Sequence, residues 1–135
     1  FALGFENIKH SFEVRSQIFK GFVGNTKTIS IINTSKNGKI AVFEGFLDFL
    51  SYLTDHNITD FESTAIILNS TAQQNRAKEH LTSIDFEKAY FFLDNDESGE
   101  KAFEFLSTSL PYPVINKSSV YAGFNDYNEY LMSKK

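Results

Sequence analysis

The sequence KIAVFEGFLDFLSYL, residues 39–53, joins a short apolar run to a helical pattern. Residues 40–43 are apolar in succession, without the alternation of a strand that has one face in water. The residues that follow place apolar side chains on one helix face: Phe46, Phe49, Leu50 and Leu53. This order predicts a buried strand followed by a helix that packs on the same sheet.

The same pattern occurs twice more. Apolar runs at residues 65–68 (AIIL) and 89–93 (AYFFL) are each followed by a helical stretch of about 10 to 15 residues, as in βαβ units. A fourth strand is expected at residues 113–115, after the two prolines, and a short helix at residues 126–132. The pattern predicts an α/β fold with about four parallel strands and flanking helices.

Upstream of residue 39, three β-prone runs are separated by polar or glycine-containing segments: residues 12–15, 18–23 and 28–32. We expect these runs to form a small antiparallel sheet, the lead-in, that precedes the α/β region. Asn37-Gly38 predicts a turn at its end. The predicted division is therefore a basic, β-rich segment at 1–38 and an α/β domain at 39–135. The chain opens on Phe1 and has no signal-peptide pattern, so we expect it to be a piece of a longer protein.

Composition excludes several classes. Hydrophobic residues make up 41% and charged residues 22% of the 135 residues, which is typical of a globular domain. No apolar run approaches the roughly 20 residues that span a bilayer, so no membrane partner is expected. Without cysteine, and with three scattered histidines, the chain offers no zinc site, and its composition suits a cytoplasmic protein.

The charges are segregated along the chain. Residues 1–39 carry six cations against two carboxylates, whereas residues 40–135 carry seven cations against fifteen carboxylates. Two explanations of this segregation are equally good before the positions of the carboxylates are known. One is chance together with solvated helix faces, and the other is a basic surface that binds phosphates.

Acidic residues follow two of the predicted strands. Glu44 and Asp48 come after the first, and Asp94 and Asp96 after the third. Because parallel strands end at the same edge of a sheet, these side chains are expected to cluster there. Two unit charges about 5 Å apart repel by roughly 3 kcal/mol at an effective dielectric of about 20, so a cation should offset the repulsion. Carboxylate oxygens together with phosphates are the ligands that magnesium prefers.

Two alternatives explain these acidic residues without a magnesium site. One is a structural role at the ends of helices, and the other is a calcium site. Asp48 could serve the helix dipole, and Asp94-Asn95-Asp96 could be a capping turn. An EF-hand calcium loop matches at four residues: Asp94, Asp96, Ser98 and Gly99. The twelfth position of that loop is Phe105 instead of glutamate, and a strand precedes it instead of a helix, which disfavours calcium.

The motifs Glu44-Gly45-x-x-Asp48 and Asp94-x-Asp96-x-x-Gly99, in this order, resemble those of the toprim domain. That family spans bacterial primases, type IA and type II topoisomerases and small nucleases, and it has a Rossmann-like sheet. The resemblance covers residues 39–131, the greater part of the predicted domain at 39–135. The segments VFEGFLDFLS at 42–51 and NDYN at 125–128 look most like primase-like toprim proteins of mobile genetic elements, related to bacterial DNA primase.

The resemblance implies a role for each acidic residue. Glu44 would be the acid–base residue of nucleotidyl transfer or phosphodiester cleavage. Asp94 and Asp96 would bind Mg²⁺, with Mn²⁺ as an alternative and no zinc in this fragment. Asp48 and Asp126 match further acidic positions that help to bind metal in primase-like members, Asp126 through a short motif.

The basic lead-in would face this acidic edge, with Arg15, Lys20 and Lys27 on template or nucleotide phosphates. The implied enzyme is a magnesium-dependent, primase-like nucleotidyltransferase of DNA replication that acts on single-stranded DNA with nucleoside triphosphates. A helicase or a zinc-binding domain elsewhere in the full-length protein would be its partner. Two alternatives stay open: nuclease or topoisomerase-type phosphodiester chemistry on the same carboxylates, and a catalytically silent module that binds nucleic acid or a protein.

Overall fold

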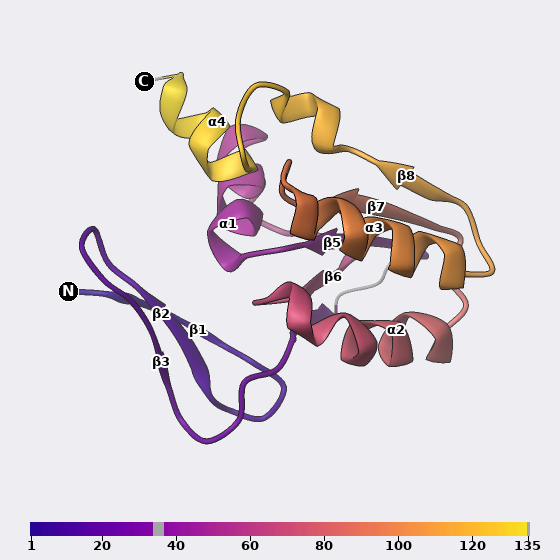
Figure 1. Cartoon of the computed structure of the whole chain (residues 1–135), viewed down its shortest axis with the longest axis horizontal. Helices are drawn as coiled ribbons and strands as arrows, with labels where there is room; N and C mark the ends of the chain where they lie inside the picture. Colours follow the sequence, from indigo (N-terminus) through magenta and orange to yellow (C-terminus); the bar gives the residue numbers. More distant parts are fainter. Residues whose placement is uncertain (34–36, 135) are drawn as a thin grey trace.

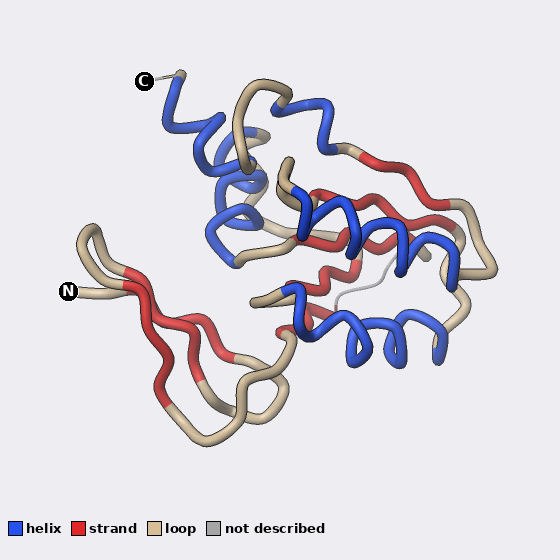
Figure 2. Tube along the Cα trace, viewed as in Figure 1, coloured by secondary structure: helices blue, strands red, loops and turns tan. Residues whose placement is uncertain are grey.

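The chain forms two β-sheets. The computed structural model describes residues 1–33 and 37–134, so Lys36, one of the cations of the basic segment, lies outside the described residues. A three-stranded sheet at the N-terminus lies beside a five-stranded sheet that carries the helices (Figure 1 and Figure 2). Within the described residues, none of the helices has the length and apolar character needed to cross a bilayer.

The N-terminal sheet is an antiparallel meander of β1 (Leu3–Glu6), β2 (Phe12–Arg15) and β3 (Lys20–Val23). β2 and β3 confirm two of the three strands expected in the lead-in. β1 was not expected, because a four-residue segment with glycine at its second position carries little strand signal.

The third run expected in the lead-in, residues 28–32, contributes to the large sheet instead of the small one. β4 (Ser30–Asn33) pairs antiparallel with β6 (Thr64–Ile67) at the edge of the large sheet. Ile31 and Ile32 alternate across the strand and pack against hydrophobic cores on opposite faces of that sheet. A strand that is apolar on both faces fits a sheet covered on both faces. The predicted division between residues 38 and 39 stays a prediction.

The large sheet has the strand order β4-β6-β5-β7-β8. Its other members are β5 (Lys39–Phe43), β7 (Lys88–Phe92) and β8 (Val114–Asn116). The strands β5, β6, β7 and β8 are parallel, so all four strands of the predicted α/β region are confirmed. Every residue of β6 is buried, which explains why its sequence does not alternate.

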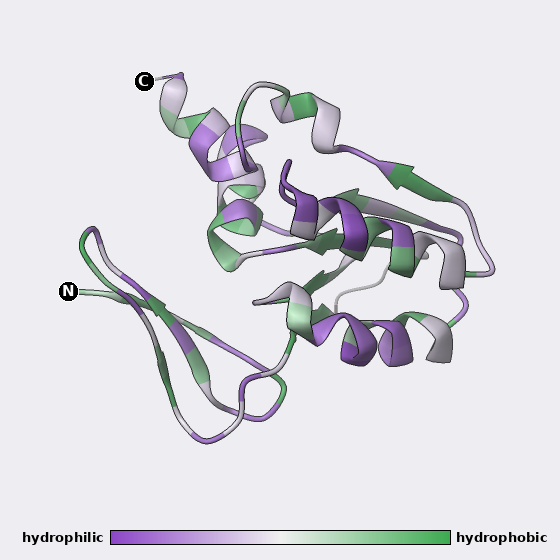
Figure 3. Cartoon of the chain, in the orientation of Figure 1, coloured by the Kyte–Doolittle hydropathy of each residue, from purple (hydrophilic) through white to green (hydrophobic). Residues whose placement is uncertain are grey.

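The helices cover both faces of the large sheet. They are α1 (Phe46–Asp55), α2 (Gln74–Ser83), α3 (Glu97–Ser109) and α4 (Tyr127–Ser133), with short 3₁₀ turns η1 (Thr71–Gln73) and η2 (Ser118–Tyr121). α1 and α4 pack on one face, and α2 and α3 on the other (Figure 1). The central strands are strongly hydrophobic, whereas α2 is mostly hydrophilic (Figure 3).

The helix face predicted from spacing after the first strand is confirmed, and α3 packs in the same way on the other face of the sheet. Phe46 and Phe49 of α1 are buried in the core on one face of the sheet, and Ala102 and Leu106 of α3 in the core on the other. The edge at which the parallel strands end faces the N-terminal sheet (Figure 1). The fold therefore places the residues that follow these strands opposite the basic segment.

Candidate metal centre

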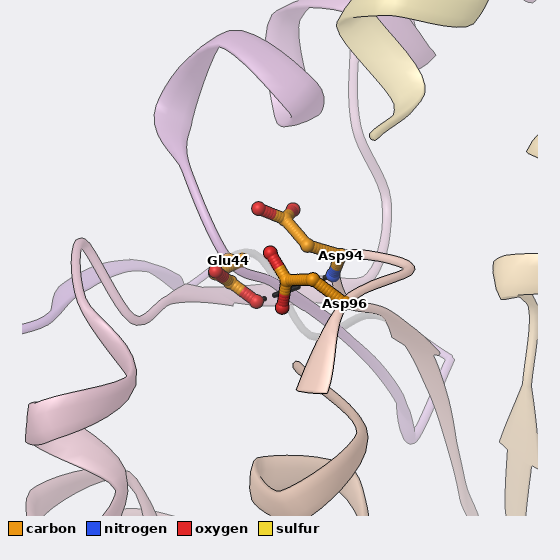
Figure 4. A group of neighbouring side chains, drawn as sticks. All are labelled: Glu44, Asp94 and Asp96. Carbon is orange, nitrogen blue, oxygen red and sulfur yellow. Dashed lines mark hydrogen bonds between the residues drawn. The ribbon is translucent and has the colours of Figure 1, made fainter. Parts of the chain in front are cut away.

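Glu44 and Asp94 leave the same edge of the sheet from neighbouring strands. β5 and β7 are parallel, and their last residues, Phe43 and Phe92, lie opposite each other. The Glu44 side chain reaches toward the end of β7, where its Oε1 accepts a hydrogen bond from the Asp94 backbone N–H at 3.1 Å (Figure 4). The clustering expected from the strand ends is confirmed for this pair.

Asp96 completes a group of three carboxylates. One oxygen from each of Glu44, Asp94 and Asp96 lies within 4.8 Å of the other two. Among the residues that the structure describes, no other three His, Cys, Asp or Glu side chains meet in this way. Figure 4 shows Asp94 and Asp96 on one turn, with Glu44 beside them. The geometry suits a cation with oxygen ligands, and the assignment of these residues as ligands stays a prediction.

Gly99 explains the spacing of the second motif. Asp96 is the N-cap of α3, and its Oδ1 accepts a hydrogen bond from the Gly99 backbone N–H at 2.8 Å. Gly99 is buried, and a Cβ built at this position would collide with the carbonyl oxygen of Asp94. Glycine is therefore required for α3 to begin directly against the turn that carries both aspartates.

Burial and neighbouring charges raise the pKa of two of these carboxyl groups, Glu44 and Asp94. Burial, and next the charge of Glu44, raise the pKa of Asp94 to about 9. Burial is also the main cause that raises the pKa of Glu44 above its usual range. The Asp94 Oδ1 is buried and has no hydrogen-bond partner among the described residues. Within residues 1–33 and 37–134, neither Glu44 nor Asp94 forms an ion pair with a cationic side chain. The pair fits a bound metal ion, which would favour the charged forms.

Asp48 and Asp126 line the same cleft as Glu44 and Asp94, outside the three-carboxylate group. Asp48 lies in the first turn of α1, and its Oδ1 accepts a hydrogen bond from the Asn128 backbone N–H at 3.1 Å. Burial, and next the charge of Asp126, raise the pKa of Asp48 to about 7. The structure thus brings all five predicted acidic residues to one edge, in two neighbouring sets.

The structural alternatives can now be compared with the geometry. Asp96 and Asp126 both cap helices. The Oδ1 of Asp96 accepts a hydrogen bond from the Gly99 backbone N–H, and the Oδ1 of Asp126 accepts one from the Glu129 backbone N–H, each at 2.8 Å. Each cap uses one carboxylate oxygen, so the other remains available to a ligand. Asp94 follows the buried strand β7, and Phe105 lies inside α3, so the EF-hand alternative is wrong.

The basic residues of the N-terminal sheet form the opposite wall of the cleft. Arg15 and Lys20 lie opposite each other on β2 and β3, and both line the cleft together with Lys27. The cleft has a volume of about 470 Å³ and is lined by carboxylates on the side of the large sheet. The expected juxtaposition of cations and carboxylates is present, and contact of these cations with phosphates stays a prediction.

Aromatic contacts hold the small sheet in this position. The ring of Phe5 in β1 stacks on Phe46 of α1 at 5.3 Å between centroids and meets Phe49 edge-on at 6.3 Å. The backbone N–H of Ile8 also donates to the carbonyl of Ile29 at 3.0 Å, just before β4. The basic wall is therefore packed on the same helix that carries Asp48.

Asn95 is a site residue that no sequence motif marks beyond its place in the Asp94-Asn95-Asp96 turn. Its side-chain amide donates to three backbone carbonyls of the loop after β8, those of Ser118, Tyr121 and Phe124, at 3.0 to 3.3 Å. Its backbone N–H donates to the Asn125 carbonyl at 2.7 Å. Asn95 therefore attaches the segment that leads to Asp126 to the turn between the two aspartates.

Asn69 follows β6 and belongs to neither of the two acidic motifs of the sequence. It has a positive φ of 65°, and its side-chain amide donates to the Thr28 carbonyl at 2.9 Å and to the Ser30 hydroxyl at 3.0 Å. Its backbone N–H donates to the Glu44 carbonyl at 2.9 Å. Asn69 thus joins the start of β4 to the backbone of the acid–base candidate.

Residues 41–131 match the family model described as Toprim-like. No curated protein sequence matches the chain.

Solved structures share the fold. The chain is similar to the primase fragment of the bacteriophage T7 primase-helicase, with a TM-score of 0.72 and 20% identity over 98% of this chain and 57% of the other. Similar primase domains occur in a T7 assembly with the lagging-strand DNA polymerase, an RNA/DNA hybrid and dTTP (TM-score 0.67, 22% identity, 98% of this chain and 70% of the other). The zinc-binding and RNA polymerase domains of the Aquifex aeolicus primase match with a TM-score of 0.58 and 17% identity, over 98% and 36% of the two chains.

Proposed function

Since the chain belongs to the Toprim-like family, we propose that it catalyses magnesium-dependent nucleotidyl transfer on DNA, in the synthesis of a primer on a single-stranded template. The observation that carries the proposal is the cleft, where carboxylates at the ends of parallel strands face the basic residues of the N-terminal sheet. The likeness of the fold to primase fragments favours primer synthesis over the other reactions of the family.

The residues present fit a magnesium ion. Asp94 and Asp96 would hold it, with Asp48 and Asp126 as further acidic groups in the same cleft. The donor set consists of carboxylate oxygens, and the buried Asp94 Oδ1 has no partner among the described residues. When bound, magnesium supplies positive charge that neutralises phosphate oxygens as the transfer proceeds.

Glu44 would act as the acid–base residue. Its pKa is raised, mainly by burial, which brings the group closer to the neutral pH at which a general base works best. In this role Glu44 takes the proton of the attacking primer hydroxyl. Arg15, Lys20 and Lys27 on the opposite wall would hold the phosphates of the template or of the incoming triphosphate.

The proposal includes partners outside this chain. The chain spans 57% of the length of the T7 primase fragment and 36% of the A. aeolicus fragment. The first comes from a primase-helicase and the second includes a zinc-binding domain. A helicase or a zinc-binding domain in the full-length protein is therefore the partner that we propose.

The test is a primer-synthesis assay with single-stranded DNA, labelled nucleoside triphosphates and Mg²⁺, resolved on a denaturing gel. We expect labelled oligonucleotides from the wild type and a loss of at least about 100-fold for Glu44→Gln, the size of a general-base contribution. Asp96→Asn should lose activity and still fold, because asparagine caps a helix as well as aspartate does. Glu104→Gln, an exposed change of the same kind on α3, is the matched control.

Two results contradict the proposal. Shortening of a labelled DNA substrate without nucleotide incorporation would assign the same carboxylates to a nuclease. Binding of single-stranded DNA, with neither synthesis nor cleavage in any metal, would assign the chain to the silent binding modules.

A further inference from the structure

A second cavity lies over the face of the large sheet that carries α1 and α4. It has a volume of about 400 Å³ and shares none of its lining residues with the cleft. Its floor is formed by the start of β5 together with Tyr90 and Phe92, the middle and the last residue of β7. Ala41 lies opposite Tyr90 in this floor, and its single methyl group leaves the space above it open.

The walls of this cavity are aromatic. Five rings from four segments line it: Tyr52, Phe61, Tyr90, Phe92 and Tyr127. The ring of Tyr52 lies 5.1 Å from Phe92 and 6.4 Å from Phe61, between centroids. Rings at these distances offer both faces and edges to a planar group that enters.

The charged groups that line the cavity are cationic. Lys39 and Lys117 line it, and no carboxylate does so among the described lining residues. Neither lysine forms an ion pair within residues 1–33 and 37–134. In a chain with a net charge of −4, two unpaired lysines beside one cavity select for an anion.

Hydroxyl groups add polar contacts. Tyr52 and Tyr90 line the cavity, and neither hydroxyl makes a hydrogen bond to another part of the described chain. Burial, and next the neighbouring Tyr90, raise the pKa of Tyr52, so its hydroxyl stays protonated and can donate. His56 donates from Nδ1 to the Tyr52 carbonyl at 3.1 Å, which leaves Nε2 as an acceptor in the neutral ring.

We propose that this cavity is a second ligand site, which takes a planar anionic ligand of mononucleotide size. The ring of the ligand lies among the aromatic walls, and its phosphate lies at one of the two lysines that line the cavity, Lys39 or Lys117. The volume is within the range of small-molecule sites, and a few polar groups in a mainly apolar wall are typical of them. The site does not depend on the proposed enzymatic function, because it shares no residue with the candidate metal centre.

The experiment is calorimetric titration of the 135-residue chain with adenosine monophosphate at low salt in EDTA, which keeps metal ions out of the cleft. We expect saturable binding with a Kd below about 1 mM. The double variant Lys39→Gln/Lys117→Gln should bind at least 10-fold more weakly, whereas Lys9→Gln, a change at an exposed lysine outside both cavities, should bind as the wild type does. Glu44→Gln should also bind unchanged, which separates this test from that of the enzymatic function.

Further titrations divide the ligand into its parts. Adenosine and inorganic phosphate should each bind at least 10-fold more weakly than the monophosphate. Equal binding of phosphate alone would remove the aromatic walls from the site, and equal binding of adenosine would remove the lysines. The proposal is overturned by any of these results, by absent saturation, by unchanged affinity in the double variant, or by an equal loss in Lys20→Gln/Lys27→Gln, which would place the nucleotide in the cleft. Should the double variant not fold, shifts of the Ala41, Tyr52 and Tyr90 amide resonances on titration of the wild type decide instead.

Discussion

Asp94 keeps its proton at neutral pH because its carboxyl group is buried beside Glu44. Its pKa of about 9 in the folded chain is well above the value near 3.8 expected when the chain unfolds. Between these two values the folded state binds a proton that the unfolded state releases. Linkage then requires that the free energy of unfolding falls as the pH rises through this interval. Asp48, with a pKa of about 7, acts in the same direction.

We therefore expect the metal-free protein to lose stability between pH 5 and pH 9. Its melting temperature, measured by calorimetry in EDTA, should fall by at least about 3 °C, which corresponds to roughly 1 kcal/mol for a domain of this size. Asp94→Asn should flatten this dependence, because the amide does not titrate, and Mg²⁺ should raise the melting temperature most at high pH. A wild type and an Asp94→Asn variant with the same pH profile would contradict the assignment.

Asn95 supports a second prediction at the residue scale. Asn95→Ala removes the donors to three loop carbonyls, so the free energy of unfolding should fall by about 1 to 2 kcal/mol. The stabilisation by Mg²⁺ should also decrease, because the loop carries Asp126 toward the cleft. Urea denaturation with and without Mg²⁺ measures both effects. Asn75→Ala, at an exposed position of α2, is the control, and an equal effect there would show that Asn95 has no special role.

The acidic residues could be predicted and Asn95 could not, for a physical reason. Glu44, Asp94 and Asp96 follow strands, and the ends of parallel strands meet whatever the rest of the chain does. The acceptors of the Asn95 side chain lie 23 to 29 residues further along the chain. Their position depends on how the loop after β8 folds back, which no local pattern encodes.

At the scale of elements, the α/β region was predictable and the lead-in only partly so. β5, β6 and β7 are apolar without alternation because both of their faces are covered, and this leaves a clear mark in the sequence. β4 carries the same kind of signal in only two isoleucines, which is too short to distinguish an edge of the large sheet from a strand of the small one. Its partner β6 comes 30 residues later, so pairing was decided by tertiary contacts.

Asn69 should be the residue that fixes β4 beside β6. Asn69→Gly tolerates the positive φ and loses the two side-chain hydrogen bonds, so it should cost about 1 kcal/mol of unfolding free energy. Asn69→Ala loses the same bonds and adds strain at a left-handed position, so it should cost about 1 kcal/mol more. Urea denaturation of the two variants provides the comparison. If alanine were tolerated as well as glycine, the backbone at residue 69 would have relaxed, and Asn69 would not fix β4 beside β6.

At the scale of the whole molecule, the segregation of charge along the sequence becomes a cleft with walls of opposite sign. Composition alone could not distinguish this arrangement from solvated faces, because it contains no information on how the two sheets are placed. The contact of Phe5 with Phe46 and Phe49 determines that placement. Fifteen phenylalanines are spread along the chain, and nothing in the sequence indicates which of them join the two sheets.

The basic wall predicts a salt dependence of binding. If Arg15, Lys20 and Lys27 contact the backbone of a single strand, each contributes about 0.7 to the slope of log affinity against log salt. The triple alanine variant should therefore flatten the slope by about two and bind more weakly, as measured by fluorescence anisotropy with labelled single-stranded DNA. Lys9, Lys78 and Lys101, changed together to alanine, remove the same charge away from the cleft. A similar slope in both triple variants would show that only net charge matters.

Gly99 also restricts how the gene for this protein can vary. Every other amino acid that a single base change can produce from a glycine codon carries a Cβ, and a Cβ at residue 99 would collide with the carbonyl oxygen of Asp94. No amino-acid substitution that a single base change produces at this codon is therefore mild. Ser98, its exposed neighbour on α3, faces no such limit. In a library of random variants selected for a folded protein, residue 99 should stay glycine while residue 98 varies.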